Sequence, residues 1–372
     1  MTVRKIVYIV AGARPNFSKI APLARAFQSH ENIQCEIVHT GQHYDFALND
    51  AFFEELEIPR PAHNFHIGSG THAYQTGKVM LAFETLCLKN RPDCTIVVGD
   101  VNSTAACAIT AKKLHVPVAH VEAGLRSGDI AMPQEVNRLL TDSISDWLFA
   151  TEQSAIDNLL REGKNPAAIF HVGHVMVDNL LFQLKRLAAI ERSALFCNDI
   201  KERLLADGLG YAVITLHRPS NVDDDNALRA CCEAIKKIAE FIPVFFPAHP
   251  RTMARLEKLE IHFGKNIYLT NSLSYMAFLN LWKDAHFVLT DSGGLQEETT
   301  ALGIPCLTMR NSTERPVTVE IGSNTIVGTN TEDILSAVHN ILYGQAKRGT
   351  CPELWDGQSA NRIAAILATR LT

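Results

Sequence analysis

The sequence has no excess of positive charge, and this excludes two classes of partner. It carries 35 lysines and arginines against 40 aspartates and glutamates, so the formal net charge of its 372 residues is −5. Nucleic acids and anionic membranes are usually bound through a basic surface, so we expect neither as a partner. Any phosphate group must therefore be held by a few placed cations and by backbone N–H groups.

Metal-type cysteine spacings and long apolar runs are also missing. The nine cysteines show no metal-ligand or redox spacing, so we expect a cytoplasmic protein without a resident metal. The apolar run IVYIVAGA near the N-terminus is too short to cross a bilayer and is predicted to be a buried strand, not a signal peptide. With 47% hydrophobic and 20% charged residues, the composition is typical of a soluble globular protein.

Short β-rich runs alternate with amphipathic helical patterns through both halves of the chain. Strands are expected at 5–10, 35–40, 94–99, 117–122, 147–150 and 169–173, and then at 211–216, 243–248, 266–270, 286–290 and 305–309. This order predicts an α/β fold with two doubly wound, Rossmann-like domains, each built on a parallel sheet. We expect domains at 1–175 and 176–372, with the last helix crossing back to the first domain. Ligands should bind at the carboxyl ends of the strands, in a cleft between the domains.

Residues 290–316, TDSGGLQEETTALGIPCLTMRNSTERP, carry the strongest local signal. A predicted strand ends at Asp291-Ser292-Gly293-Gly294 and passes into a helical pattern. Such a turn presents free N–H groups and the positive end of a helix dipole to a phosphate. Further along, Glu298 offers a carboxylate to sugar hydroxyls, and Arg315 offers a guanidinium to a diphosphate. The combination predicts a nucleotide-sugar site.

Polar residues also follow the predicted strands of the first half. Arg14 and Lys19 follow the first strand, Asp100 the third and Glu122 the fourth. Asp100 fits either a binding turn or the N-cap of a helix. Glu122 ends an apolar strand, where an unpaired carboxylate would be costly. It therefore either pairs with an arginine or serves as an acid in the cleft, and we favour the cleft.

Histidines occupy matching positions in the second half. His217 follows the strand at 211–216, and His249 follows the strand at 243–248. Either one alone would usually be a structural imidazole. Their repetition at strand ends favours a role in catalysis or binding.

Several motifs together resemble one enzyme family. In chain order they are GARPNFSK, TGQHYD, GDVNST, HVEAGLRS, PQEVNR, TLHRPSN, PAHP, TDSGGLQEE and TERP, and they resemble those of the non-hydrolysing UDP-N-acetylglucosamine 2-epimerases. The resemblance implies a glycosyltransferase-B-like fold, a homodimer, and reversible conversion of UDP-N-acetylglucosamine to UDP-N-acetylmannosamine without NAD or a metal. It is nearest to a bacterial, capsule-type member that supplies N-acetylmannosamine units for surface polysaccharide.

Together with the strand-end positions, the resemblance implies roles for individual residues. The catalytic candidates are Asp100, Glu122, Glu135 and His217. The candidates for binding UDP and the sugar are Arg14, Lys19, Gln134, Arg138, His249, Ser292, Gly293, Gly294, Glu298 and Arg315, while Gln42 and His43 match part of a regulatory pocket.

The implied reaction is elimination of UDP across C1–C2 to give a 2-acetamidoglucal, followed by re-addition with a proton on the opposite face of C2. The C2 hydrogen is not acidic, so its removal must be coupled to the loss of UDP. This requires a carboxylate base at C2 and cations at the departing diphosphate. An axial acetamido group should cost about 1 kcal/mol, so the gluco epimer should be favoured by roughly tenfold or less.

Two segments depart from the family pattern. The family usually shows two adjacent acids before x-Asn-Arg, whereas here Gln134 precedes Glu135. An amide is not a general base, so either Glu135 substitutes or the first acid only orients the sugar. Residues 66–72 read HIGSGTH, where some bacterial members use basic residues to bind a second substrate molecule as an activator, and this leaves activation by substrate open.

Other functions fit the same sequence. A hydrolysing 2-epimerase would release free N-acetylmannosamine, and a glycosyltransferase would need an acceptor and leave C2 intact. A nucleotide-sugar sensor would bind without turnover. A donor bearing a second acetamido group or a uronic acid would also fit.

Overall fold

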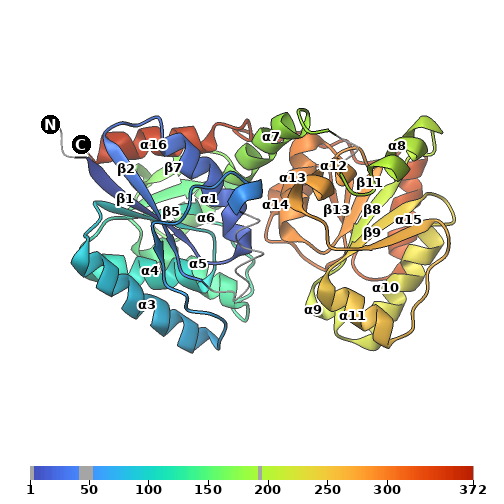
Figure 1. The fold of residues 1–372 in the computed structure, drawn as a ribbon, viewed down its shortest axis with the longest axis horizontal. Helices are drawn as coiled ribbons and strands as arrows, with labels where there is room; N and C mark the ends of the chain where they lie inside the picture. The colour runs from blue at the N-terminus through green and yellow to red at the C-terminus, as the bar shows by residue number, and fades with distance from the viewer. Residues whose placement is uncertain (1–3, 42–52, 192–194, 372) are drawn as a thin grey trace. The chain divides into compact units, whose positions relative to one another are not determined.

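The chain forms two compact units, Met1–Phe182 with Glu353–Thr372, and Gln183–Pro352. The structure is a computed structural model that describes residues 4–41, 53–191 and 195–371. Each unit contains a parallel sheet with helices packed against it (Figure 1). The α/β class predicted from the alternating pattern is confirmed.

The first unit is built on a seven-stranded sheet of order β3-β2-β1-β4-β5-β6-β7. Its strands are β1 (Lys5–Ala11), β2 (Ile33–His39), β3 (His63–Asn64), β4 (Cys94–Val98), β5 (Val118–Ala123), β6 (Trp147–Ala150) and β7 (Ile169–His171). Its helices are α1 (Arg14–Phe27), α3 (His72–Lys89), α4 (Asn102–Lys113), α5 (Pro133–Ile144), α6 (Gln153–Arg161), η1 (Pro166–Ala168) and α16 (Ser359–Arg370). In Figure 1, α1 and α16 lie on one side of this sheet and α3 and α4 on the other.

The second unit is built on a six-stranded sheet of order β10-β9-β8-β11-β12-β13. Its strands are β8 (Ala212–Thr215), β9 (Val244–Ala248), β10 (Ile267–Asn271), β11 (Phe287–Thr290), β12 (Cys306–Thr308) and β13 (Asn324–Ile326). Its helices are α8 (Asn198–Ala206), α9 (Pro219–Val222), α10 (Asp225–Ile238), α11 (Pro250–Lys258), α12 (Tyr275–Trp282), α13 (Gly293–Leu302), α14 (Pro316–Glu320) and α15 (Thr331–Leu342).

The central strands are apolar because both of their faces are covered. All five residues of β4, CTIVV, are buried, and so are all four residues of β11, FVLT. Parallel strands covered by helices on both faces read as continuous apolar runs, which is why these segments could be recognised from sequence. Each sheet also has a switch point, between β1 and β4 in the first and between β8 and β11 in the second. In open α/β sheets the loops after such strands form the ligand site.

The change from the first unit to the second falls within a helix. The sequence analysis placed a boundary between residues 175 and 176, whereas the units change at Phe182 and Gln183, inside α7 (Val175–Leu187). The C-terminal segment belongs to the first unit. There Ala360 N donates to Asp178 Oδ2 at 2.7 Å, and Trp355 Nε1 donates to the carbonyl oxygen of Thr151 at 3.1 Å.

Candidate active site

The turn after β1 is fixed to the end of β4 by one buried asparagine. Asn16 Oδ1 accepts N–H groups from Gly12 and Ala13 at 3.3 and 3.1 Å, while its Nδ2 donates to the carbonyl oxygen of Val98 at 3.0 Å. One turn further along α1, Lys19 points at Glu122, with Nζ 2.5 Å from Oε2. The first turns of α1 are therefore tied to the ends of β4 and β5.

Glu122 has an unusual backbone conformation and is buried. Its φ is +70°, and the pairing register of β5 with β6 shifts between Val121 and Ala123. A left-handed conformation costs a non-glycine residue about 1–2 kcal/mol, so this bulge is held by its surroundings. The side chain pairs with a lysine and not with an arginine. Its Oε1 lies 3.9 Å from His174 Nε2 and has no hydrogen-bond partner among the described residues.

Arg138 on α5 joins two further acids. Its Nη2 lies 2.5 Å from Asp100 Oδ2, and its Nη1 lies 2.9 Å from Glu135 Oε2. The N-cap of α4 is Val101, so Asp100 does not cap that helix. Its carboxylate is instead held by the Arg138 guanidinium.

Glu135 is committed to the loop that precedes α5. Its carboxylate accepts N–H groups from Ser127 at 3.0 Å and from Gly128 at 3.0 Å. Burial raises the pKa of Glu135, but these backbone hydrogen bonds and Arg138 outweigh it, so that the net pKa lies below the ordinary value. Gln134, one residue earlier, is exposed.

Three predicted residues cannot be placed in full. Gln42 and His43 lie outside the described residues, and so does the side chain of Arg14. The backbone of Arg14 begins α1.

Asp291 organises the switch point of the second unit. His217 Nδ1 lies 2.8 Å from Asp291 Oδ1, and the backbone N–H groups of His217 and Arg218 donate to the same carboxylate at 3.0 and 2.8 Å. Asn221 Nδ2 also donates to it at 3.1 Å. Burial raises the pKa of Asp291, but His217 and the backbone donors lower it further than burial raises it. The carboxylate therefore fixes the His217 ring with Nε2 directed away from Asp291.

The Ser-Gly-Gly turn begins a helix, as the sequence indicates. Ser292 is the N-cap residue of α13, which starts at Gly293. A Cβ atom added at Gly293 would lie 3.8 Å from Arg315 Cζ, so the guanidinium lies against this turn. Arg315 is oriented by Glu297, with Nε 2.6 Å from Oε1. A helix N-terminus beside an arginine is suited to a phosphate.

Glu298 and His249, the remaining candidates of the second unit, each have a hydrogen-bond partner. Tyr275 donates its hydroxyl to Glu298 Oε1 at 2.9 Å. His249 is the N-cap residue of α11, and its Nδ1 accepts the N–H of Arg251 at 3.2 Å. The centres of the His217 and His249 rings are 6.5 Å apart, so the two strand-end histidines are neighbours.

Sequence reasoning missed Asp291 and Arg218 as parts of this site. Arg218 Nε is buried without a hydrogen-bond partner among the described residues. Burial lowers the pKa of Arg218, and nearby Arg310 lowers it further, yet an arginine remains protonated in proteins. A half-buried guanidinium of this kind is an anion-binding candidate. Arg218 lies in the TLHRPSN motif, but only the adjacent His217 was given a role from the sequence.

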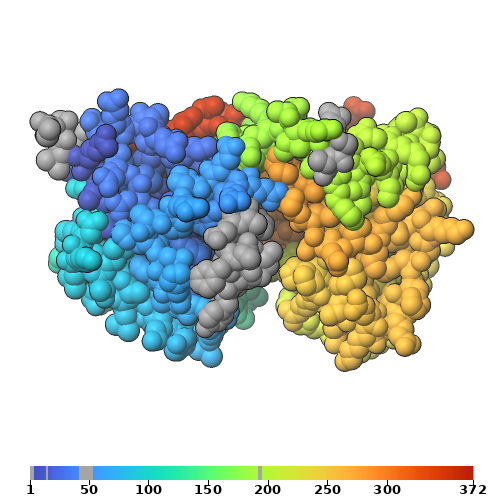
Figure 2. All heavy atoms as spheres, viewed as in Figure 1, coloured from blue at the N-terminus to red at the C-terminus, as the bar shows by residue number. Residues whose placement is uncertain are grey.

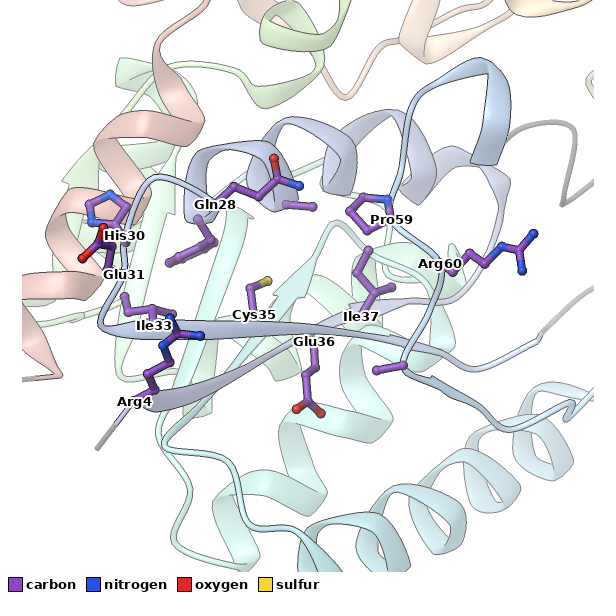
Figure 3. A pocket seen from close by; sticks show the side chains of 13 residues that line it. Arg4, Gln28, His30, Glu31, Ile33, Cys35, Glu36, Ile37, Pro59 and Arg60 are labelled. Carbon is purple, nitrogen blue, oxygen red and sulfur yellow. The ribbon is translucent and has the colours of Figure 1, made fainter. Parts of the chain in front are cut away.

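A separate hollow of about 340 Å³ lies on the first unit beside β2 (Figure 3). Its lining includes Arg4, Gln28, Glu31, Cys35 and Arg60 but none of the predicted site residues. In the described part of the chain, no group of three or more His, Cys, Asp or Glu side chains could hold a metal ion. No described helix is both long enough and apolar enough to cross a membrane.

Comparisons with known proteins agree over nearly the whole chain. A family model described as UDP-N-acetylglucosamine 2-epimerase matches residues 25–368. The UDP-N-acetylglucosamine 2-epimerase of Methanocaldococcus jannaschii is 43% identical over 96% of this chain and 98% of that protein. A UDP-2,3-diacetamido-2,3-dideoxy-D-glucuronate 2-epimerase of Pseudomonas aeruginosa is 39% identical over 98% of this chain and 99% of that protein. The crystal structure of the M. jannaschii enzyme in complex with UDP-GlcNAc and UDP matches with a TM-score of 0.85 at 42% identity, covering 98% of this chain and 99% of that chain. The chain therefore belongs to the UDP-N-acetylglucosamine 2-epimerase family.

Proposed function

We propose that this isomerase converts UDP-N-acetylglucosamine reversibly into UDP-N-acetylmannosamine by inverting C2. UDP is eliminated across C1–C2 to leave a 2-acetamidoglucal, and it adds back after C2 is protonated on the opposite face. The observation that carries this proposal is membership of the epimerase family over residues 25–368. The polar residues at the two switch points support it.

The second unit is proposed to bind the UDP moiety. The N-terminus of α13, Arg315 and His217 would neutralise the diphosphate as it leaves, when its negative charge grows. Arg218 would add a guanidinium, because no described carboxylate lies within salt-bridge distance of it. Glu298 would accept hydrogen bonds from ribose hydroxyls.

The first unit is proposed to act on the sugar. Inversion needs an acid/base group on each face of C2, and Asp100 and Glu122 are the two acids not committed to backbone N–H groups. Glu135 is already saturated by Ser127, Gly128 and Arg138. We assign it the role of holding Arg138 against Asp100. On this assignment Gln134, which is exposed, carries no proton.

The test is a variant series assayed with UDP-N-acetylglucosamine. Asp100→Asn and Glu122→Gln should each lower kcat by about 10²- to 10⁴-fold, the usual range for an acid/base group, while UDP binding survives. Gln134→Glu is the matched control at the position that departs from the family, and it should leave the rate unchanged. Wild-type rates in both Asp100→Asn and Glu122→Gln would contradict the assignment.

Product identity separates this function from its alternatives. The proposal predicts UDP-N-acetylmannosamine as product, with UDP still attached. Free N-acetylmannosamine as the main product would instead identify a hydrolysing enzyme. Because one relative is a UDP-2,3-diacetamido-2,3-dideoxy-D-glucuronate 2-epimerase, both donors should be assayed side by side. Turnover of the diacetamido-glucuronate donor alone would overturn the choice of substrate.

We also propose that the enzyme is a homodimer formed through α3. Tyr74, Leu81 and Leu88 are spaced seven residues apart on one face of this helix, with 54%, 64% and 72% of their surface exposed. Figure 2 shows this segment on the surface of the first unit. Gly77 lies on the same face, and a Cβ added there would meet no described atom within 4 Å. A mid-helix glycine costs about 1 kcal/mol relative to alanine, so its presence is explained by close approach of a second helix.

The occupant that fits this face is a second copy of the chain. An antiparallel pair of α3 helices centred on Leu81 places Tyr74 near Leu88 of the partner subunit. The same pairing places Lys78 near Glu84 of the partner subunit, so that opposite charges meet around an apolar centre. An isologous interface of this kind is self-complementary.

Sedimentation velocity tests the dimer. Leu81→Glu should give monomers, and Gly77→Ala should weaken the dimer while raising the thermal stability of the monomer. Leu160→Glu is the control, because Leu160 is an exposed apolar residue on α6. A wild-type monomer, or a dimer untouched by Leu81→Glu, would contradict the proposal.

We propose that the product serves surface polysaccharide synthesis in the cytoplasm, because an activated sugar nucleotide is a donor for glycosyl transfer. The nine cysteines are free thiols, which supports a reducing compartment. Deleting the gene should deplete N-acetylmannosamine from the cell-surface glycans, and unchanged glycans would contradict this role.

A further inference from the structure

A buried aspartate near the end of α5 contacts strand β5 and the loop that follows it, which carry Glu122. Asp142 Oδ1 lies 2.6 Å from His120 Nδ1, and its Oδ2 accepts the N–H of Gly124 at 3.0 Å. Gly124 lies two residues after Glu122, at the end of the β5 bulge. Asp142 and His120 are fully buried, so these bonds are sheltered from competing water.

His120 extends this contact to the loop after β4. Its Nε2 donates to the carbonyl oxygen of Gly99 at 2.9 Å, since a carbonyl oxygen can only accept. Because Nδ1 faces Asp142 and Nε2 faces Gly99, the ring is held in one orientation. The peptide that joins Gly99 to Asp100 is thus anchored from the side of β5.

Gly99 separates the two proposed acids. Asp100 follows it directly, and a Cβ added at Gly99 would lie 3.4 Å from both Glu122 Oε2 and Lys19 Nζ. A displacement of the Gly99 carbonyl would therefore move Asp100 and press against the Lys19–Glu122 pair. The position of this one peptide sets the spacing of both acids.

The outer side of the network is closed by an ion pair. Arg126 Nη2 lies 2.8 Å from Asp142 Oδ2 and 2.7 Å from Glu162 Oε2. Burial raises the pKa of Asp142, but His120, Arg126 and the Gly124 N–H lower it below its ordinary value. Asp142 is therefore a carboxylate at neutral pH and accepts hydrogen bonds at both oxygens.

We propose that His120, oriented by Asp142, is a positioning residue for epimerisation, which holds the Gly99–Asp100 peptide and thereby the spacing of Asp100 and Glu122. This inference rests on the proposed function, because it assigns His120 no task apart from the proton transfers at C2. A misplacement of about 1 Å at reacting groups can cost about 10²-fold in rate. UDP binding, assigned to the second unit, should not depend on His120.

The test compares two amides at position 120. His120→Gln places an amide N–H near the position of Nε2 and can still donate to Gly99, whereas His120→Asn reaches only toward Asp142. We expect kcat to fall by about 100-fold in His120→Asn and by no more than about tenfold in His120→Gln. The KM for UDP-N-acetylglucosamine should change little in either variant.

The isotope effect of a substrate deuterated at C2 separates positioning from folding. Loss of folded protein lowers the rate but leaves the isotope effect on kcat unchanged. A misplaced base instead makes proton transfer more rate-limiting, and this raises the isotope effect. His120→Asn should therefore raise the isotope effect, and His120→Gln should keep the wild-type value. Glu162→Gln, which alters only the outer edge of the network, is the control and should match wild type.

Two results would overturn the inference. One is a wild-type isotope effect in His120→Asn, together with a fall in rate no larger than the loss of folded protein. The other is a raised isotope effect in His120→Gln, and this outcome is informative even if His120→Asn does not fold. If wild-type enzyme does not epimerise either donor, the proposed function itself fails and the inference falls with it.

Discussion

Lys19 Nζ and Glu122 Oε2 are 2.5 Å apart in the first unit, and 9% and 2% of their side-chain surfaces are exposed. The pair joins α1 to the bulge at the end of β5. A buried charge that loses its partner costs about 3–5 kcal/mol, because the remaining charge is left without solvent. This predicts strong energetic coupling between the two side chains.

A double-variant cycle measures that coupling. Lys19→Met and Glu122→Leu should each lower the free energy of unfolding by about 3 kcal/mol or more. The double variant should lose at least about 1 kcal/mol less than the sum of the two, since it leaves no unpaired charge. Urea denaturation gives the three values. Strict additivity would show that the two groups do not interact.

Asp291→Asn should impair turnover without unfolding the second unit. An amide cannot accept all the N–H groups that Asp291 now binds, and it no longer fixes the proton on Nδ1 of His217. We expect kcat to fall by roughly 100-fold. Asp223→Asn is the control, because Asp223 pairs with Arg251 on the exposed surface. Equal rates in both variants would mean that the orientation of His217 is unimportant.

Glu314 predicts a specific loss of stability in acid. Burial raises its pKa, but the bidentate contact with Arg310, at 2.9 Å on both oxygens, and the charge of Arg315 lower the pKa to about 2. A carboxyl with a depressed pKa stabilises the fold above its unfolded value of about 4.3, and this stability is lost as the pH falls toward 2. The contribution at neutral pH is on the order of 3 kcal/mol.

Unfolding measured from pH 7 to pH 2 checks this prediction. Glu314→Gln should be less stable than wild type at pH 7, and the difference should shrink steadily below about pH 4. A difference that is constant with pH would show that the ionised carboxylate makes no such contribution.

Two glycines with similar backbone φ angles should differ sharply in how much stability is lost when each is replaced by alanine. Gly124 has φ +84°, and a Cβ there would lie 2.3 Å from the carbonyl oxygen of Ala155. Gly128 has φ +74°, and a Cβ there would meet no described atom within 4 Å. Gly128→Ala should cost about 1 kcal/mol for the backbone conformation alone. Gly124→Ala should cost about 4 kcal/mol or more because the β5 loop must also move, and equal thermal melting temperatures would contradict this reading.

Sequence patterns predicted the strands and the loops after them, because central parallel strands are continuous apolar runs. The edge strands β3, with sequence HN, and β13, with sequence NTI, were missed because neither is a continuous apolar run. Other strand ends shifted by up to two residues. Helix α1 begins at Arg14, soon after the end of β1, because Pro15 is accommodated in a first helical turn.

The chemistry of individual side chains was harder to predict, because it depends on partners that are distant in sequence. Consecutive side chains on a helix point about 100° apart, so Gln134 is exposed while Glu135 is buried. The sequence alone could not say which of these two side chains points toward the proposed acids. The pairing of His120 with Asp142 and of His217 with Asp291 spans 22 and 74 residues. No local spacing signals such contacts.

The central claim is that C2 is deprotonated and reprotonated during turnover. Its most direct test is proton NMR of UDP-N-acetylglucosamine with purified enzyme in D2O. The account predicts UDP-N-acetylmannosamine, with deuterium at C2 in both epimers at equilibrium and the gluco epimer in excess. Formation of the manno epimer with its C2 hydrogen fully retained, or a spectrum that does not change at all, would contradict it.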